Sequence, residues 1–178
     1  MDLGVISVRY ARALLKSAIE QKCEQRVYQE MQSLGAAYIQ VPQLRNAIDN
    51  PMLDKENKFK LLKTAAGGDV SELTDRFINL VLEGDREKDI QFMAAAYITL
   101  YRKQKNITRG KLITAAPVSP DTEKKMKQMV ESRTQGTVEF QTEIDPDIIG
   151  GFILEYDTYR MDASVQSQLR NILTQLKK

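Results

Sequence analysis

The spacing of apolar residues changes once along this chain of 178 residues, close to residue 105, and the change restricts the folds open to it. Before that point apolar residues recur every three or four positions, as in Met31, Leu34 and Tyr38, which is the repeat of a helix buried along one face. After it, β-prone or alternating runs at residues 111–118 and 137–144 are typical of short strands. The sequence therefore predicts two parts of different structural class.

Turn signals divide the first part into about six helices. Asp54 stands immediately before a helical pattern, where a short oxygen-bearing side chain caps free amide groups, and a further helix begins at Ser71. Pro42 interrupts one helix, and the pair Gly67 and Gly68 ends another. Because the connections are short, we expect an antiparallel helical bundle over residues 1–105.

The second part, residues 106–178, mixes the two repeats. A β-prone run closes at Pro117, a helix starts after Ser119, an alternating strand follows, and a further strand or strand pair surrounds Asp157. A helix with Val165, Leu169, Ile172, Leu173 and Leu176 on one side ends the chain. We therefore predict an α+β protein, in which a small α/β module with a short mixed sheet follows the bundle.

Composition excludes several classes of function. The chain has no histidine and one cysteine, Cys23, so histidine-based triads and most zinc sites lack their usual groups, and no internal disulfide can form. Lys and Arg number 16 against 14 Asp and Glu in residues 1–105, and 10 against 10 in residues 106–178. A nucleic-acid-binding protein would gather positive charge in one part, which argues against that class. With no apolar run of about 20 residues and no signal-peptide layout, we expect a cytosolic chain.

Gly150 and Gly151 are the glycines most suggestive of a ligand loop, but their context favours a structural role. A phosphate loop opens into a helix, whereas these glycines precede the strand-like run that begins at Phe152. We interpret them as a bulge or a close backbone approach. Nearby carboxylates have turn chemistry, and Asp162 precedes a helix as an N-cap would, so catalysis by this group is not expected.

Two helices carry more apolar surface than one buried face requires. In the first, Arg9, Arg12, Lys16 and Glu20 form one narrow polar stripe, while most other side chains are apolar or small. The helix that begins after Ser71 is similar. Residue pattern alone leaves two interpretations open: both helices are central in the bundle, or they form a surface groove for a partner helix.

Four segments together resemble the delta subunit family of F-type ATP synthases, which includes the mitochondrial oligomycin-sensitivity-conferral protein. The resemblance is collinear over essentially the whole chain, and its strength lies in the order and spacing of the segments. These are Val8–Leu14; Phe77–Leu82 with Arg86; Ile113–Pro117 with Ser119; and Asp145–Phe152 with Asp162–Val165 and Leu169. One departure is Tyr156-Asp157, where the family commonly turns its last hairpin on Gly-Asp; this leaves the turn type open.

The resemblance implies a non-catalytic stator subunit of a proton-translocating ATP synthase. In the family, the N-terminal bundle holds N-terminal helices of the alpha subunits of the catalytic head, and the C-terminal module holds the b subunits of the membrane-anchored peripheral stalk. The subunit thereby resists rotor torque during ATP synthesis. The resemblance also implies no cofactor, no metal, no nucleic acid and no homo-oligomer, and a peripheral location at the cytoplasmic face of a bacterial inner membrane.

By position, the resemblance assigns the partner-binding groove to the first helix and the helix after Ser71. Its expected lining is Tyr10, Ala13, Leu14, Phe77, Leu80 and Val81. Two other functions stay open at this point: a soluble helical adaptor or regulator that binds a peptide or RNA, and, more remotely, a carboxylate enzyme. The first predicts a basic face and the second a deep acidic pocket.

Overall fold

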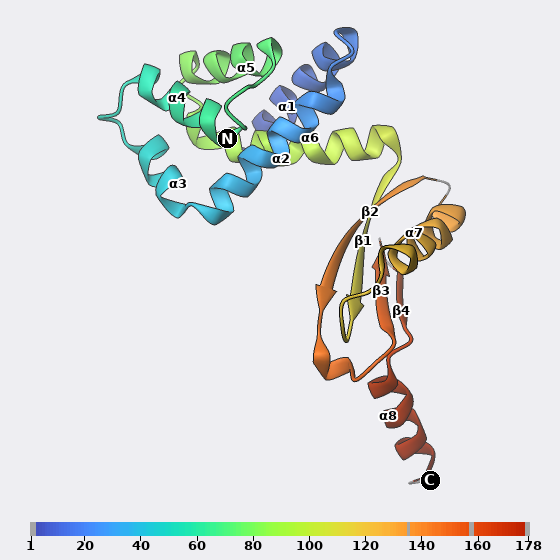
Figure 1. Cartoon of the computed structure of the whole chain (residues 1–178). Coiled ribbons are helices and arrows are strands. Elements are labelled where there is room, and N and C mark those ends of the chain that lie inside the picture. Colours follow the sequence, from blue (N-terminus) through green and yellow to red (C-terminus); the bar gives the residue numbers. More distant parts are fainter. Residues whose placement is uncertain (1–2, 135, 157–158, 177–178) are drawn as a thin grey trace. The chain divides into compact units, whose positions relative to one another are not determined.

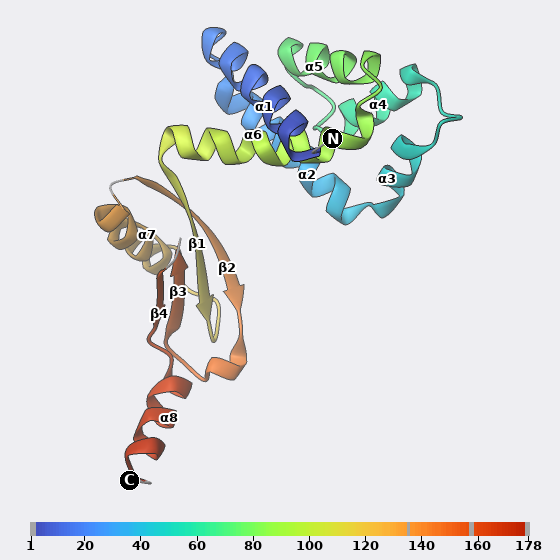
Figure 2. The same cartoon turned by 180° about the vertical axis from the view of Figure 1, so that it is seen from behind.

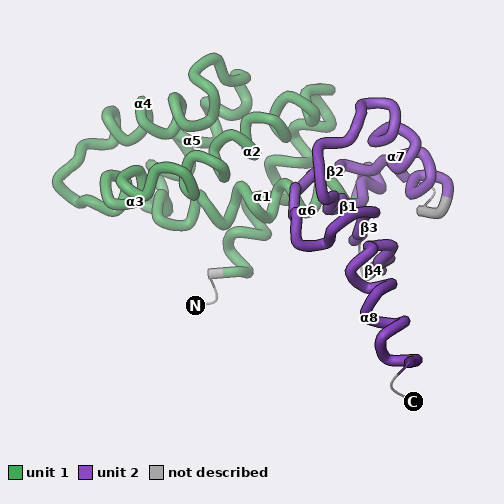
Figure 3. The backbone as a smooth tube through the Cα atoms, turned by 60° about the horizontal axis from the view of Figure 1, so that its bottom comes forward, with its two compact units in different colours: residues 1–103 green, residues 104–178 purple. Residues whose placement is uncertain are grey.

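The computed structural model describes residues 3–134, 136–156 and 159–176. The chain divides into two compact units, residues 1–103 and residues 104–178, coloured green and purple in Figure 3. The boundary falls in the last turn of a helix, two residues before the position at which the apolar spacing changes in the sequence.

The described part of unit 1 is helical, as the sequence predicts (Figures 1 and 2). Its elements, in chain order, are α1 (Leu3–Glu20), α2 (Glu24–Gln40), α3 (Pro42–Asp49), α4 (Lys55–Ala65), α5 (Glu72–Glu83), the 3-10 turn η1 (Glu87–Asp89) and α6 (Ile90–Lys105).

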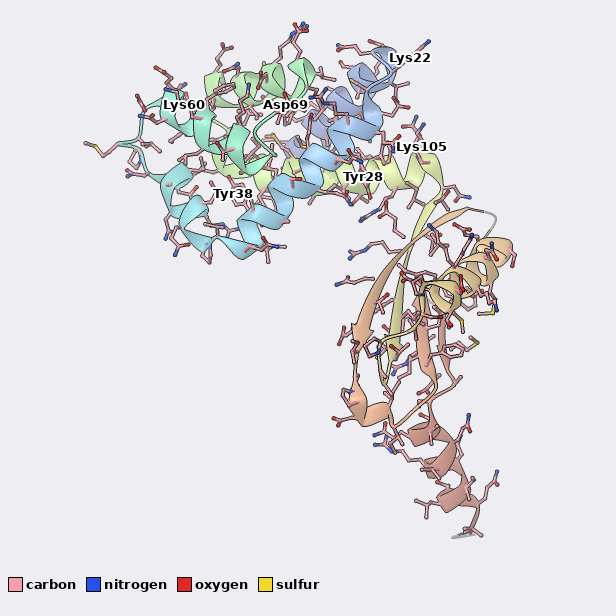
Figure 4. All side chains as sticks on the ribbon, in the orientation of Figure 1. Lys22, Tyr28, Tyr38, Lys60, Asp69 and Lys105 are labelled. Atoms are coloured by element: carbon pink, nitrogen blue, oxygen red, sulfur yellow. The ribbon has the colours of Figure 1, made fainter. Side chains whose placement is uncertain are left out.

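The second helix, α2, is central in this bundle, since it packs against α1, α3, α4 and α5. Its Val27, Met31 and Leu34 are fully buried, which explains the three-and-four spacing seen in the sequence. Tyr28, labelled in Figure 4, stacks on Tyr101 of α6 with ring centroids 4.3 Å apart. Apolar and aromatic contacts of α2 therefore hold the bundle together.

Helix ends in unit 1 follow the local chemistry of the sequence. The side chain of Asp54 accepts a hydrogen bond from the Asn57 amide, and that of Ser71 accepts one from the Thr74 amide, so both residues are N-caps. After α4, Gly67 and Gly68 have φ of 123° and 80°, and their amides bond to the carbonyls of the last turn. Pro42 was predicted only to end a helix, but it is also the first residue of α3. At that position a helix does not use the backbone N–H that proline lacks.

Unit 2 is built around a four-stranded mixed sheet, as predicted (Figure 1). The order in the sheet is β2-β1-β3-β4; β1 and β2 are parallel, and the other two pairs are antiparallel. The elements are β1 (Ile107–Thr114), α7 (Pro120–Thr134), β2 (Thr137–Ile144), the 3-10 turn η2 (Pro146–Ile148), β3 (Phe152–Tyr156), β4 (Tyr159–Asp162) and α8 (Val165–Leu176).

The core of unit 2 lies between the sheet and α7. Leu112, Val138 and Leu154, one from each of three neighbouring strands, pack with Val130 of α7 and are almost completely buried. Parallel strands need a long crossover, and α7 provides the one between β1 and β2. The turn between β3 and β4, where the sequence leaves the hairpin geometry at Asp157 open, lies outside the described residues.

Candidate functional site

The candidate site is a groove between α1 and α5, which pack directly against each other in unit 1. Each helix turns some apolar residues inward: Ala11 and Leu15 of α1 are buried, as are Ile78 and Val81 of α5. A second apolar row on each helix faces the groove, which is why both helices have more apolar surface than one buried face needs.

A buried carboxylate fixes the start of α5 against α2. Glu30 of α2 is 5% exposed, and its oxygens accept hydrogen bonds from the Ser71 amide (2.6 Å) and the Ser71 hydroxyl (2.8 Å). The Thr74 hydroxyl and the Arg26 guanidinium also donate to it. A buried carboxylate with several donors satisfied is a strong positional constraint, so Glu30 sets where one wall of the groove begins.

The groove has a volume of about 310 Å³, at the small end of the range of ligand pockets. Ala13 and Ser17, both small, leave the hollow on the α1 side. Leu80 stands at the rim of the α5 wall and is 54% exposed. The lining residues are Arg9, Tyr10, Ala13, Leu14, Ser17, Leu73, Arg76, Phe77 and Leu80.

Five of the six residues that the sequence places in the groove line it: Tyr10, Ala13, Leu14, Phe77 and Leu80. Leu14 and Phe77 are only 4% and 6% exposed, so they form the floor and also belong to the core. Leu80, in contrast, is largely open to solvent.

Val81 does not line the groove and corrects the prediction. It is 0% exposed, because the next residue along a helix is rotated by about 100° and here points into the bundle. The prediction missed Arg9, Ser17, Leu73 and Arg76. The four-residue step from Ala13 to Arg9 and to Ser17 was a usable signal, because positions i and i±4 share a helix face.

Arginines from both helices are part of the groove lining. Arg9 of α1 is exposed, and Arg76 of α5 forms an ion pair with Glu72 one turn earlier on the same helix. The floor between them is apolar. The groove therefore fits an elongated apolar surface, such as one side of a helix, rather than a small polar substrate.

A second exposed apolar surface lies on α8 in unit 2. None of the described α8 residues is buried. Leu169, Ile172, Leu173 and Leu176 are 47%, 52%, 55% and 78% exposed, and their spacing places them on one helix face. Large apolar side chains gathered on one face of a helix mark an interaction surface.

Gly150 and Gly151 serve the backbone of unit 2. Gly151 has φ of 75°, and a Cβ atom there would lie 2.2 Å from the carbonyl oxygen of Ala163. The Gly150 carbonyl accepts a hydrogen bond from the Val165 amide at 3.0 Å. The two glycines thus permit the close approach of two chain segments at the start of α8.

Asp162 also organises the start of α8, but it is not the N-cap that the sequence predicts. The N-cap is Ser164, whose hydroxyl accepts a hydrogen bond from the Ser167 amide. Asp162 accepts from the Ser164 hydroxyl (2.6 Å) and amide (3.0 Å) and from the Ser167 hydroxyl (2.8 Å). These bonds lower the pKa of the Asp162 carboxyl, the Ser164 hydroxyl most of all. Asp162 therefore buttresses the cap from two residues before it.

Metal-binding groups are not gathered in the described residues. They contain no cluster of three or more metal-ligating side chains, and no described helix is long and apolar enough to cross a membrane. Burial, and then the nearby Glu24 and Glu30 carboxylates, raise the pKa of the Cys23 thiol, which is the opposite of what an activated nucleophile requires.

Comparisons with known proteins agree on one family. A family model described as the ATP synthase delta (OSCP) subunit matches residues 6–176. The chain is 50% identical over 176 residues to ATP synthase subunit delta of Phocaeicola vulgatus, a match that covers 98% of this chain and 95% of the relative. It is 44% identical over 176 residues to ATP synthase subunit delta of Parabacteroides distasonis, covering 99% and 98%.

A solved structure has the same fold. A chain of the mitochondrial ATP synthase hexamer of Toxoplasma gondii aligns with a TM-score of 0.65 at 22% identity, over 97% of both chains. At that identity the likeness speaks for the fold alone.

Proposed function

Because the chain belongs to the ATP synthase delta (OSCP) subunit family, we propose that it joins the catalytic head of a proton-translocating F-type ATP synthase to the peripheral stalk. Delta subunits are non-catalytic parts of the synthase, and so is this chain. By holding the head against rotor torque, it makes proton flow drive ATP synthesis instead of turning the head.

The observation that carries this proposal is a pair of exposed apolar surfaces, one on each of two separately packed units. The groove between α1 and α5 belongs to unit 1, and the apolar stripe of α8 belongs to unit 2. A connector needs two such surfaces, whereas an adaptor for a single peptide needs one.

The groove is the proposed site for the N-terminal helices of the head's alpha subunits. Its floor is apolar, and it runs along two packed helices. Nine residues line it, including the large aromatic residues Tyr10 and Phe77. Arg9 to Ser17 spans about 12 Å at 1.5 Å per residue, which accommodates about two turns of a bound helix.

The α8 stripe is the proposed site for the b subunits of the stalk. Its four large apolar residues would lose their exposure against a helical partner, and Ser164 and Asp162 fix where the helix starts. In this arrangement the subunit is a peripheral component of the synthase, and we place it at the cytoplasmic face of a bacterial inner membrane, where its relatives' family is expected.

Affinity purification from detergent-solubilised membranes tests the proposal. Wild-type chain should retain both alpha and b subunits. Leu80→Asp should lose alpha and keep b, and Leu173→Asp should lose b and keep alpha, because each buries a charge in one interface only. Retention of both sets of subunits by both variants, or loss of both sets by each variant although it folds, would contradict two separate docking surfaces.

A further inference from the structure

Unpaired positive charge surrounds the α1 side of the groove. Arg9, Arg12 and Lys16 of α1 are all exposed. None of the ion pairs formed within the described part of the chain involves these three side chains. Two other exposed cations of unit 1 do have partners: Lys60 pairs with Glu56, and Lys55 pairs with Asp85. Glu20 follows Lys16 by one turn, whereas Arg9 and Arg12 have no acidic residue three or four positions away within the described part of α1.

The α5 wall contributes a second guanidinium to the groove. Arg76 is paired with Glu72, but the two side chains are 64% and 78% exposed. An exposed pair of this kind on one helix contributes little to stability, so it competes poorly with a carboxylate brought by a partner. Asp75, the acidic residue next to Arg76 in the sequence, forms an ion pair with Lys63, whose Nζ lies 2.9 Å from its Oδ2.

The two lining arginines lie toward opposite ends of the groove. A Cβ atom at Gly84, which follows α5, would lie 3.6 Å from the Tyr10 hydroxyl, so the C-terminal end of α5 lies beside the first half of α1. Arg9 is next to Tyr10, whereas Arg76 is eight residues, or about two turns, before Gly84. The apolar floor therefore has one arginine near each end, and each arginine comes from a different wall.

We propose that this groove selects a helix whose apolar stripe is flanked by carboxylates, one on each side and about two turns apart, which pair with Arg9 and Arg76. The inference rests on the function proposed above and specifies the chemistry of the partner. Apolar contacts with the floor supply most of the affinity, while the arginines set the register of the helix and reject partners with basic flanks. Arg12 and Lys16 add to the attraction at longer range without lining the groove.

Charge variants of the full-length chain test the inference by their binding to the purified catalytic head. Arg9→Glu with Arg76→Glu should weaken binding about 5- to 20-fold near 50 mM NaCl, and the difference should shrink near 500 mM because salt screens rim charges. Lys103→Glu is the control for a single charge reversal outside the groove, since Lys103 is exposed on α6 and does not line the groove. It should change binding less than about 2-fold. If the double variant unfolds, Arg9→Gln and Arg76→Gln remove each positive charge singly without reversing it, and each should weaken binding by a smaller factor in the same direction.

A pair of synthetic helical peptides tests the sign of the partner's charge. Both have one leucine stripe; one has glutamates on its flanks and the other has lysines. The glutamate peptide should bind the wild-type chain at least about 10-fold more tightly, and the double variant should reverse that preference.

The outcomes separate this inference from the proposed function. If the double variant binds the head as Lys103→Glu does while Leu80→Ala still weakens binding, the arginine selection is wrong and the groove remains the head-binding site. If neither Leu80→Ala nor the arginine variants change head binding, the groove itself is wrong and both proposals fail.

Discussion

Leu80 provides the sharpest test of the groove, because its position predicts that truncation weakens binding of the head while it changes the stability of the free protein only a little. Full burial of a leucine side chain is worth about 1.5–3 kcal/mol. Leu80 is 54% exposed, so the free protein realises only about half of this, and Leu80→Ala should lower its free energy of unfolding by no more than about 1.5 kcal/mol. A partner helix would cover the remaining half. The same change should then weaken head binding by about 1–1.5 kcal/mol, or about 5- to 12-fold.

Ile78, two positions earlier on the same helix, is the matched control. It is 0% exposed and does not line the groove. Ile78→Ala should open a cavity and cost about 2–5 kcal/mol of folding stability. Its affinity for the head, counted per folded molecule, should stay at the wild-type value.

Both quantities are measured on the same full-length samples. Urea denaturation followed by far-UV circular dichroism reports the helical unit, and a titration with purified head gives the affinity of the folded fraction. The reasoning is refuted if Leu80→Ala destabilises the free protein as strongly as Ile78→Ala while affinity per folded molecule does not change. In that case Leu80 is a core residue.

Three further predictions concern residues that stabilise one unit or the other from within. Gly151→Ala should destabilise unit 2 by more than about 1–3 kcal/mol in denaturation, because the new Cβ would combine a positive φ with a clash against the Ala163 carbonyl. Glu30→Gln should lower the stability of unit 1 by about 1.5–3 kcal/mol, since the charge-assisted bonds to Ser71 are weakened. The folded-state pKa of Asp162 is below its unfolded value, so its contribution is present above about pH 4 and is lost as the pH falls through the folded pKa. Asp162→Asn should remove that part of the acid sensitivity of unit 2.

Each of these has a result that would count against it. Gly35→Ala, in the open middle of α2, is the control for the glycine: it should be neutral or stabilising, and equal behaviour of the two glycines would refute the close-approach argument. Unchanged stability of Glu30→Gln would mean that the amide replaces the carboxylate fully. An unaltered stability profile between about pH 2 and 5 in Asp162→Asn would exclude Asp162 as a source of acid sensitivity.

The sequence by itself determined which segments become helices and strands. These outcomes depend on local chemistry: Asp54 and Ser71 cap the helices that follow them, and Gly67 and Gly68 end α4, because free amides and left-handed backbone act within a few residues. The change of apolar period likewise separates helical from mixed structure. The resemblance to the delta family led to the proposed function, and five of the six residues that it assigned to a groove line the pocket between α1 and α5.

Tertiary structure alone decided which apolar side of a helix meets the core. Leu80 and Val81 are adjacent and both apolar, yet one is 54% exposed and the other 0%, because the neighbouring helices cover only one of the two directions. The prediction that put both in the groove had no means of knowing which direction was covered. The sequence is equally unable to predict burial in α8. Its apolar residues have the spacing of a helix face packed in a core, but they are exposed.

Long-range polar contacts were equally hidden in the sequence. Glu30 reaches the cap of α5 from 41 positions away, and no local pattern distinguishes it from a surface glutamate. The prediction that Asp162 is the N-cap of α8 was wrong, because Asp and Ser are both good N-caps and these two residues are only two positions apart. The path of the backbone makes Ser164 the N-cap, and Asp162 accepts a hydrogen bond from its amide. Local capping and periodicity act within a few residues and can be predicted from the sequence, whereas burial and long-range hydrogen bonds depend on which segments the fold brings together.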